Sequence, residues 1–224
     1  MIKAHHKKII KEISLKTLLV SSLFFIAVFV FAFLAHEIVG EKEDLFDTKV
    51  FHFLKAHTTT PLIKLMQWLT FFGNHYFLIP AYILLVTFLF FRHRNSDAIN
   101  IIVIVLSSTG LLFGLKAIYQ RHRPEIPLLR ELHDYSFPSG HALSSFIFCS
   151  ILIYLIWKSD LRPVLKYLLA GLLVIFSISI GISRIVLRYH FASDVLAGLA
   201  LGFAWVIFSF WALQKLSKKT GLRH

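Results

Sequence analysis

Six long stretches of this chain are apolar and uncharged, and shorter polar segments separate them. They cover residues 17–35, 77–91, 98–115, 142–157, 167–182 and 195–213. A helix that crosses a bilayer needs about 20 residues, and flanking Lys, Arg, Trp and Tyr side chains are stable at the interface and can extend the shorter stretches. The pattern predicts an all-α integral membrane bundle of six transmembrane helices, formed by a single domain over residues 1–224.

The first apolar stretch follows a basic arm at residues 1–16 and therefore resembles a signal peptide as well as a membrane helix. The apolar part of a signal peptide is typically about 7–15 residues long and precedes a cleavage site with small residues. Residues 17–35 form a longer run, and no convincing site of that kind follows them. We expect an uncleaved first helix.

Composition supports a membrane location. Apolar residues make up 57% of the chain, charged residues only 16%, and there are 23 Phe residues. So few charges could not cover the apolar surface of a soluble domain of this size. The formal net charge of +12 could indicate nucleic acid, but the basic residues are scattered between apolar runs. We expect them to face lipid headgroups and expect no nucleic-acid partner.

The charges of the connecting segments predict the orientation. One side would hold the arm 1–16, the loops 92–97 and 158–166, and the tail 215–224, with 14 basic and three acidic residues. The other side would hold 10 basic and nine acidic residues. Because basic loops stay in the cytoplasm, both termini should be cytoplasmic. The expected location is a bacterial inner membrane.

The segment 40–73 joins the first two predicted spans. It carries several acids and then two groups of apolar residues, at 50–54 and 62–66, a pattern that fits one or two short amphipathic helices at the membrane interface. A plain covering loop fits equally well. Both interpretations stay open.

Three clusters of polar residues lie at the ends of apolar runs, and the predicted topology puts all of them on the non-cytoplasmic face. They are Lys116-x6-Arg123-Pro124, Pro138-Ser139-Gly140-His141 and Ser183-Arg184-x5-His190-x3-Asp194. They provide cations, two imidazoles and one carboxylate beside a bilayer. That set of groups fits phosphoryl transfer, which depends on positioning and on stabilising negative charge.

The first cluster offers a mobile point charge, Lys116, and a planar fork that can hold two phosphate oxygens, Arg123. A snorkelling basic pair at a helix end would look the same. In the second cluster, a turn leads into a helix whose free N–H groups attract anions, and Gly140 allows close approach. Ser139 could bind the ligand or could simply be the N-cap.

His190 and Asp194 lie one helical turn apart on one face. Asp194 opens an uncharged run of 19 residues, where an ionised carboxylate needs a partner. A hydrogen bond from the imidazole would satisfy Asp194 and leave the other ring nitrogen free to attack. A capping acid with a neighbouring histidine is the alternative.

Together the clusters resemble the three-part signature of the type 2 phosphatidic acid phosphatases, a family that includes undecaprenyl pyrophosphate phosphatases. The signature spans residues 116–194, and no position within the three motifs departs from it. The resemblance implies that His190 is a nucleophile that becomes phosphohistidine, that Asp194 orients it, and that His141 protonates the leaving group. It also implies no metal or other cofactor, and a phosphate site formed by Lys116, Arg123, Ser139, Gly140 and Arg184.

Several neighbouring residues have less specific interpretations. We expect Arg121, His122, Arg188 and Tyr189 to contact solvent or lipid headgroups. His133, Asp134 and Tyr135 could shape the mouth of the site. Gly198-x3-Gly202 should allow close helix packing.

The predicted function is hydrolysis of a lipid phosphomonoester or pyrophosphate. A phosphotransferase with the same phosphohistidine is an alternative, and an anion-binding lipid transporter is a second one that leaves the His190–Asp194 pair unexplained. Phosphatidic acid, phosphatidylglycerophosphate, undecaprenyl pyrophosphate and lipid A phosphates all fit, and the sequence leaves the oligomeric state open.

Overall fold

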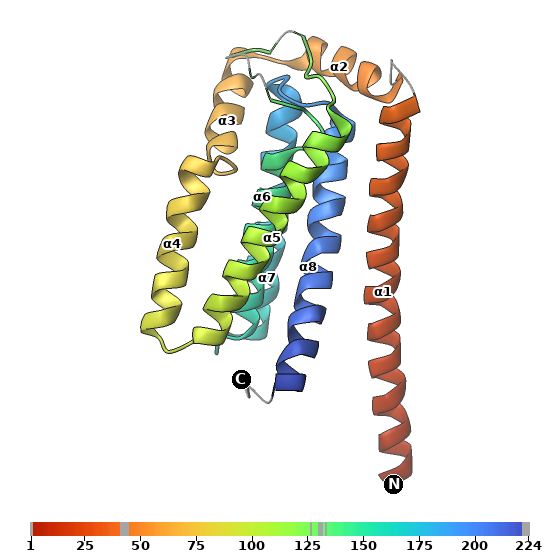
Figure 1. Ribbon diagram of the computed structural model, residues 1–224, viewed down its shortest axis with the longest axis vertical. Coiled ribbons are helices and arrows are strands. Elements are labelled where there is room, and N and C mark those ends of the chain that lie inside the picture. Colours follow the sequence, from red (N-terminus) through yellow and green to blue (C-terminus); the bar gives the residue numbers. More distant parts are fainter. Residues whose placement is uncertain (1, 41–44, 126, 130–131, 133, 221–224) are drawn as a thin grey trace.

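A computed structural model describes residues 2–40, 45–125, 127–129, 132 and 134–220, and throughout these residues all regular structure is helical (Figure 1). The helices are α1 (Ile2–Gly40), α2 (Leu45–His57), α3 (Thr60–Phe71), α4 (His75–Phe91), α5 (Asn95–Tyr119), α6 (Gly140–Trp157), α7 (Pro163–Val186) and α8 (Ala192–Thr220).

Six helical stretches are long and apolar enough to cross a membrane, which confirms the predicted bundle. They are Thr17–Ile38, Thr60–Phe91, Asn95–Tyr119, Gly140–Trp157, Pro163–Val186 and Ala192–Leu216. The second combines α3 and α4, because the turn at Gly73 and Asn74 hardly interrupts the apolar run. The segment 40–73 thus forms two helices, not a covering loop; its residues 41–44 lie outside the described residues.

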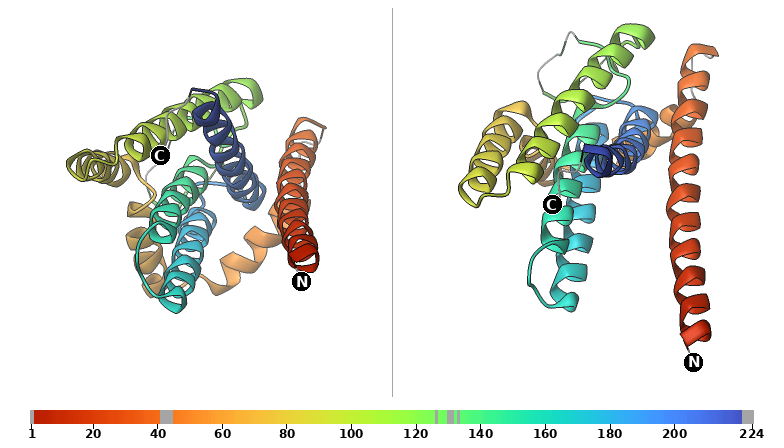
Figure 2. Two further views of the ribbon diagram at one scale, coloured as in Figure 1. Left: turned by 90° about the horizontal axis from the view of Figure 1, so that it is seen from below. Right: turned by 60° about the horizontal axis from the view of Figure 1, so that its bottom comes forward.

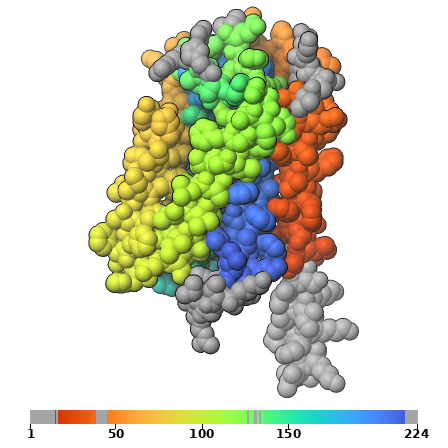
Figure 3. All heavy atoms as spheres, viewed as in Figure 1, coloured from red at the N-terminus to blue at the C-terminus, as the bar shows by residue number. Residues whose placement is uncertain are grey.

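The outward faces of these helices are apolar. At most a third of each candidate span is buried inside the protein. Large side chains such as Phe29, Leu84 and Phe113 are 69%, 71% and 65% exposed. In the space-filling view, α4, α5, α8 and α1 form one such side of the molecule (Figure 3). Lipid is the solvent that such a surface requires.

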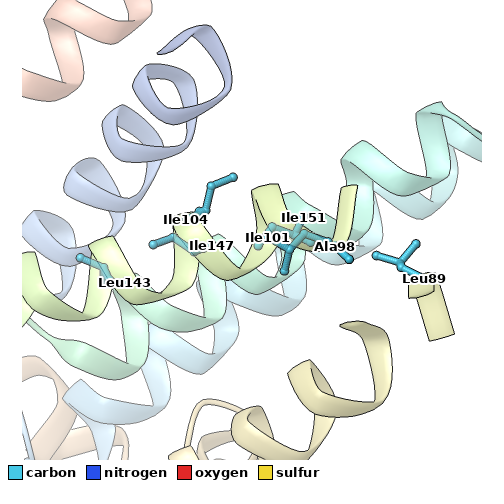
Figure 4. Close-up of a cluster of buried hydrophobic side chains, with 7 residues drawn as sticks. All are labelled: Leu89, Ala98, Ile101, Ile104, Leu143, Ile147 and Ile151. Carbon is cyan, nitrogen blue, oxygen red and sulfur yellow. The ribbon is translucent and has the colours of Figure 1, made fainter. Parts of the chain in front are cut away.

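Helix α6 lies at the centre of the bundle. It packs against α7 and α8, while α1 lies at the periphery against α8 (Figure 2). A cluster of buried aliphatic side chains fixes α6 against α4 and α5 (Figure 4): Leu89, Ala98, Ile101, Ile104, Leu143, Ile147 and Ile151.

A polar network fixes the end of the bundle where α8 ends. The buried Asp97 carboxylate accepts hydrogen bonds from Arg94, Tyr154 and Lys158, each 2.8 Å long. The start of α5 is thereby tied to the end of α6. The polar clusters of the predicted site lie at the opposite end of these helices (Figure 1).

The glycine pair on α8 allows α6 and α8 to approach closely, as predicted. A Cβ atom at Gly198 would lie 2.7 Å from the backbone oxygen of Ser139, and one at Gly202 would lie 3.3 Å from the Phe146 ring. The turn at Ser139 can therefore rest directly on the first turns of α8.

We predict that Gly198→Ala destabilises the protein by about 1–3 kcal/mol, because the added methyl group has no space. Gly171→Ala is the matched control, since a Cβ there would meet nothing within 4 Å and alanine favours the helix. Thermal unfolding in detergent should show a lower midpoint for Gly198→Ala only. Equal midpoints for the two variants would contradict the close contact.

Candidate active site

Two local features bring the loop between α5 and α6 back over the bundle. Helix α5 ends at Gln120, whose left-handed backbone (φ 44°) closes the helix with a hydrogen bond to the Lys116 carbonyl. The loop then returns to the start of α8, where the backbone N–H of Ser139 donates to the carbonyl of Asp194 (3.0 Å). The second and third clusters therefore meet.

The His190–Asp194 pair is fully buried. His190 Nδ1 lies 3.4 Å from Asp194 Oδ2, and the hydroxyl of Ser136 contacts both groups. The same carboxylate oxygen accepts a hydrogen bond from the Phe191 N–H (2.9 Å). These donors satisfy a charge that would otherwise be very costly to bury.

The other nitrogen of His190 faces the first cluster. Nη1 of Arg123 lies 3.2 Å from His190 Nε2. Because arginine can only donate, Nε2 must carry the lone pair and Nδ1 the proton, which points toward Asp194. Burial lowers the pKa of His190 from 6.5 to about 3, so that the ring is neutral at physiological pH.

Lys116 and Arg123 share one anion in this structure, the carboxylate of Asp134. Lys116 Nζ lies 2.6 Å from Asp134 Oδ2, and Arg123 Nη2 lies 2.8 Å from Oδ1. Burial raises the pKa of Asp134, but the hydrogen bonds and charges of Lys116 and Arg123 outweigh that effect, and its pKa lies below the usual value. Lys116 and Arg123, which the sequence predicts to bind phosphate, thus bind a carboxylate in this structure.

The second cluster forms the expected turn and helix start. Ser139 is the N-cap of α6, and its hydroxyl accepts a hydrogen bond from the Ala142 N–H (3.4 Å). Of the two roles that the sequence left open for Ser139, this structure shows the N-cap. Gly140 packs against Leu112, and a Cβ atom there would lie 3.2 Å from that side chain.

His141 and Arg184 complete the site from α6 and α7. His141 Nε2 is buried and has no hydrogen-bond partner among the described residues. Its ring interacts electrostatically with Arg184, His190 and Arg123, and also with His75. Arg184 donates to Thr70 Oγ1 (2.8 Å) and lies over the ring of Tyr189. Its Nε atom has no partner among the described residues, so the guanidinium keeps a free donor.

The expectation for Arg121 was wrong. We expected it to contact solvent or headgroups, but it lies inside the protein and donates to Asp194 Oδ1 (2.6 Å) and Asp47 Oδ2 (2.9 Å). Its position two residues before Arg123 could have indicated a role in the site. Tyr189 is also buried, whereas His122 is exposed and Arg188 half-buried. His133 lies outside the described residues.

A pocket of about 530 Å³ opens above the site. Its walls include His122, Arg123, Asp134, Tyr135, Arg188 and Tyr189. Asp134 and Tyr135 therefore do line the mouth, as the sequence suggested. Within the described part of the chain, no group of three or more His, Cys, Asp or Glu side chains is arranged to hold a metal ion.

Known proteins resemble this chain in sequence and in fold. The model of the PAP2 superfamily matches residues 97–218. Phosphatidylglycerophosphatase B of Bacillus subtilis is 28% identical over 145 residues, which are 63% of this chain and 70% of that protein. The undecaprenyl-diphosphatase of Sulfolobus acidocaldarius is 27% identical over 177 residues, or 75% and 79% of the two chains.

A solved structure extends the likeness to nearly the whole fold. The crystal structure of a transmembrane PAP2-type phosphatidylglycerolphosphate phosphatase from Bacillus subtilis matches with a TM-score of 0.72 and 25% identity, and covers 89% of this chain and 96% of that one. This chain belongs to the PAP2 superfamily. It is a multi-pass membrane protein and a lipid phosphatase.

The lowered pKa of His190 predicts that its ring stays neutral at pH 5, since protonation sets in only near pH 3. The unfolded chain binds that proton below about pH 6.5, so this residue also makes the folded state less stable as the pH falls from 6.5 toward 3. Protein labelled with ¹⁵N-histidine should show a neutral ring at pH 5 whose signal His190→Gln removes. A charged ring there would contradict the prediction.

We also predict that Asp134→Asn strengthens inhibition by orthovanadate about fivefold, because the vanadate no longer competes with a carboxylate for Lys116 and Arg123. The expected change in the inhibition constant is modest because the Asp134 side chain is 59% exposed and solvent weakens its ion pairs. Asp160→Asn, an exposed acid at the opposite end, is the control. An inhibition constant that is unchanged or larger in Asp134→Asn would count against a site that vanadate and the Asp134 carboxylate share.

Proposed function

We propose that the protein removes phosphate from a lipid phosphomonoester or pyrophosphate through a phosphohistidine at His190. The observation that supports this most strongly is the orientation of the His190 ring. Nδ1 faces the carboxylate of Asp194, and Nε2 faces the cation Arg123. The free lone pair thus points to the place where a phosphate would be held.

In the first step, His190 Nε2 attacks the phosphorus of a phosphomonoester or the terminal phosphorus of a pyrophosphate, and the bond from that phosphorus to the leaving oxygen breaks. His141 gives a proton to that oxygen, so that the leaving group departs as the lipid alcohol or as the lipid monophosphate. Lys116, Arg123 and Arg184 offset the negative charge of the transferring group, and Asp134 must leave Lys116 and Arg123 for this to occur. Asp194 stabilises the positive charge that the imidazole gains.

In the second step, water attacks the phosphohistidine. The neutral His141 takes a proton from the water, the bond between phosphorus and nitrogen breaks, and inorganic phosphate leaves. His190 is neutral again, and His141 again holds the proton that the first step uses. An acceptor lipid in place of water would make the same protein a phosphotransferase, so the phosphate acceptor has to be tested directly.

We further propose that the site faces the periplasm or exterior, with both termini in the cytoplasm. The distribution of basic residues supports this orientation. In that orientation α2 would lie along the outer membrane surface and could contribute apolar side chains such as Leu45 and Phe53, which are 73% and 63% exposed, to the interface.

The substrate belongs to the lipids that the relatives' names suggest. Phosphatidylglycerophosphate and undecaprenyl pyrophosphate come first, and phosphatidic acid and lipid A phosphates present similar groups to the same cations. Purified protein should be assayed for phosphate release from each lipid, with and without a second lipid as acceptor. Release without an acceptor would identify a hydrolase.

We predict that His190→Ala lowers turnover more than about a thousandfold, because the attacking nitrogen is lost. His141→Ala should lower it about a hundredfold or more, the usual effect of removing a general acid. Rapid quenching with ³²P-labelled substrate should trap an acid-labile phosphoenzyme in the parent protein, and His190→Ala should abolish it. Arg162→Ala changes an exposed side chain at the opposite end of the bundle and should leave turnover unchanged.

Full activity in His190→Ala would refute the mechanism. A phosphoenzyme that persists in His190→Ala would place the nucleophile elsewhere. A purely anion-binding transporter would give no phosphoenzyme in any variant.

A further inference from the structure

A buried chain of charges connects α2 to the His190–Asp194 pair. Arg121 donates through Nη1 to Asp194 Oδ1 and through Nη2 to Asp47 Oδ2, at 2.6 and 2.9 Å. The side chains of Asp194 and Asp47 are 0% and 3% exposed. One guanidinium thus joins two carboxylates that are 147 positions apart in sequence.

Asp47 is also fixed to the helix that carries Asp194. Its carboxylate accepts hydrogen bonds from the backbone N–H of Ser193 (2.9 Å) and from the Ser193 hydroxyl. The first turn of α8 therefore receives a negative charge at its positive end, which is a favourable arrangement. Arg121 is held further by Ser193 Oγ and by the face of the Phe191 ring.

The charges of this network do not cancel. Burial raises the pKa of Asp47, and its hydrogen bonds with Ser193 and Arg121 oppose that effect. With Asp47 ionised, Asp47 and Asp194 carry two negative charges and Arg121 one positive charge, while His190 is neutral because burial lowers its pKa to about 3. Without Asp47, Arg121 alone would neutralise Asp194. The excess negative charge lies next to a ring that becomes positive when Nε2 bonds to phosphorus. In a buried site such a match between fixed and developing charge affects the rate strongly.

We propose that Asp47 and Arg121 are positioning residues for the phosphohistidine step, in which Asp47 offsets the charge of Arg121 and keeps Asp194 effective toward His190. The proposal rests on the proposed function and gives α2 a role in the reaction. It predicts an effect on the chemical step and none on phosphate affinity, because Lys116, Arg123 and Arg184 are untouched.

The test uses Asp47→Asn, which keeps the shape of the side chain and removes its charge. We expect kcat to fall at least about tenfold, within the range seen when outer partners of a reacting group are removed. KM and the inhibition constant of inorganic phosphate, which the cations can hold without a bond to His190, should stay within about twofold, and the rate of phosphoenzyme formation should fall as kcat does. Asp47→Glu, which restores the charge, should recover part of kcat.

Asp97→Asn is the matched control. Asp97 is also a buried carboxylate paired with arginine, but at the opposite end of the bundle. Both changes should lower the thermal midpoint, and only Asp47→Asn should lower kcat. If Asp47→Asn does not fold, Arg121→Lys provides the same test, since an ammonium cannot bridge both carboxylates as the planar fork does. It too should lower kcat and leave the affinity for inorganic phosphate unchanged.

A parental kcat in Asp47→Asn would overturn the proposal. So would a loss of affinity for inorganic phosphate in step with kcat, which would indicate general disruption. His190→Ala separates this inference from the proposed function. If His190→Ala is inactive and Asp47→Asn is fully active, only the role of Asp47 fails. If His190→Ala is active, the phosphohistidine mechanism itself fails.

Discussion

The structure depends on how one buried carboxylate, that of Asp194, is satisfied. This residue opens α8 at a depth where solvent cannot reach it, and an unpaired charge there would be very unfavourable. Ser136, Phe191, Arg121 and His190 surround it with donors from the α5–α6 loop and the start of α8. Its backbone carbonyl also holds Ser139, and so α6 is tied to the same point.

Once these donors are in place, the rest of the site is constrained. His190 must direct its free nitrogen away from Asp194, toward Arg123. The turn before α6 must lie against α8, and Gly198 makes room for it. At the other end, Asp97 fixes α5 to α6 by the same principle, a buried acid surrounded by donors. Apolar packing alone would leave the helices free to slide, because lipid is as apolar as their side chains.

The sequence was sufficient to predict the bundle and the three clusters. A long uncharged run forms a transmembrane helix in a bilayer, and charged residues such as Lys116 and Asp194 at the ends of these runs need partners. Two other parts could not be predicted. Nothing near Asp47 in the sequence distinguishes it from the other acids of the segment 40–73, since its partner Ser193 is distant in the chain. The ion pairs of Asp134 depend on a loop path that shows no periodicity.

Arg121 is another residue whose partners could not be predicted from the sequence. A basic residue at the end of a membrane helix usually reaches for headgroups, and only the arrival of two carboxylates from α2 and α8 makes its burial favourable. The local sequence pattern predicts each helix, whereas tertiary contacts determine which charged side chains pair with one another.

A structure of the protein with orthovanadate bound would test whether the three clusters form one phosphate site with His190 as nucleophile. We expect vanadium bonded to His190 Nε2, its oxygens contacted by Lys116, Arg123 and Arg184, and Asp134 displaced from both cations. Vanadate bound elsewhere, with Asp134 still between Lys116 and Arg123, would contradict it.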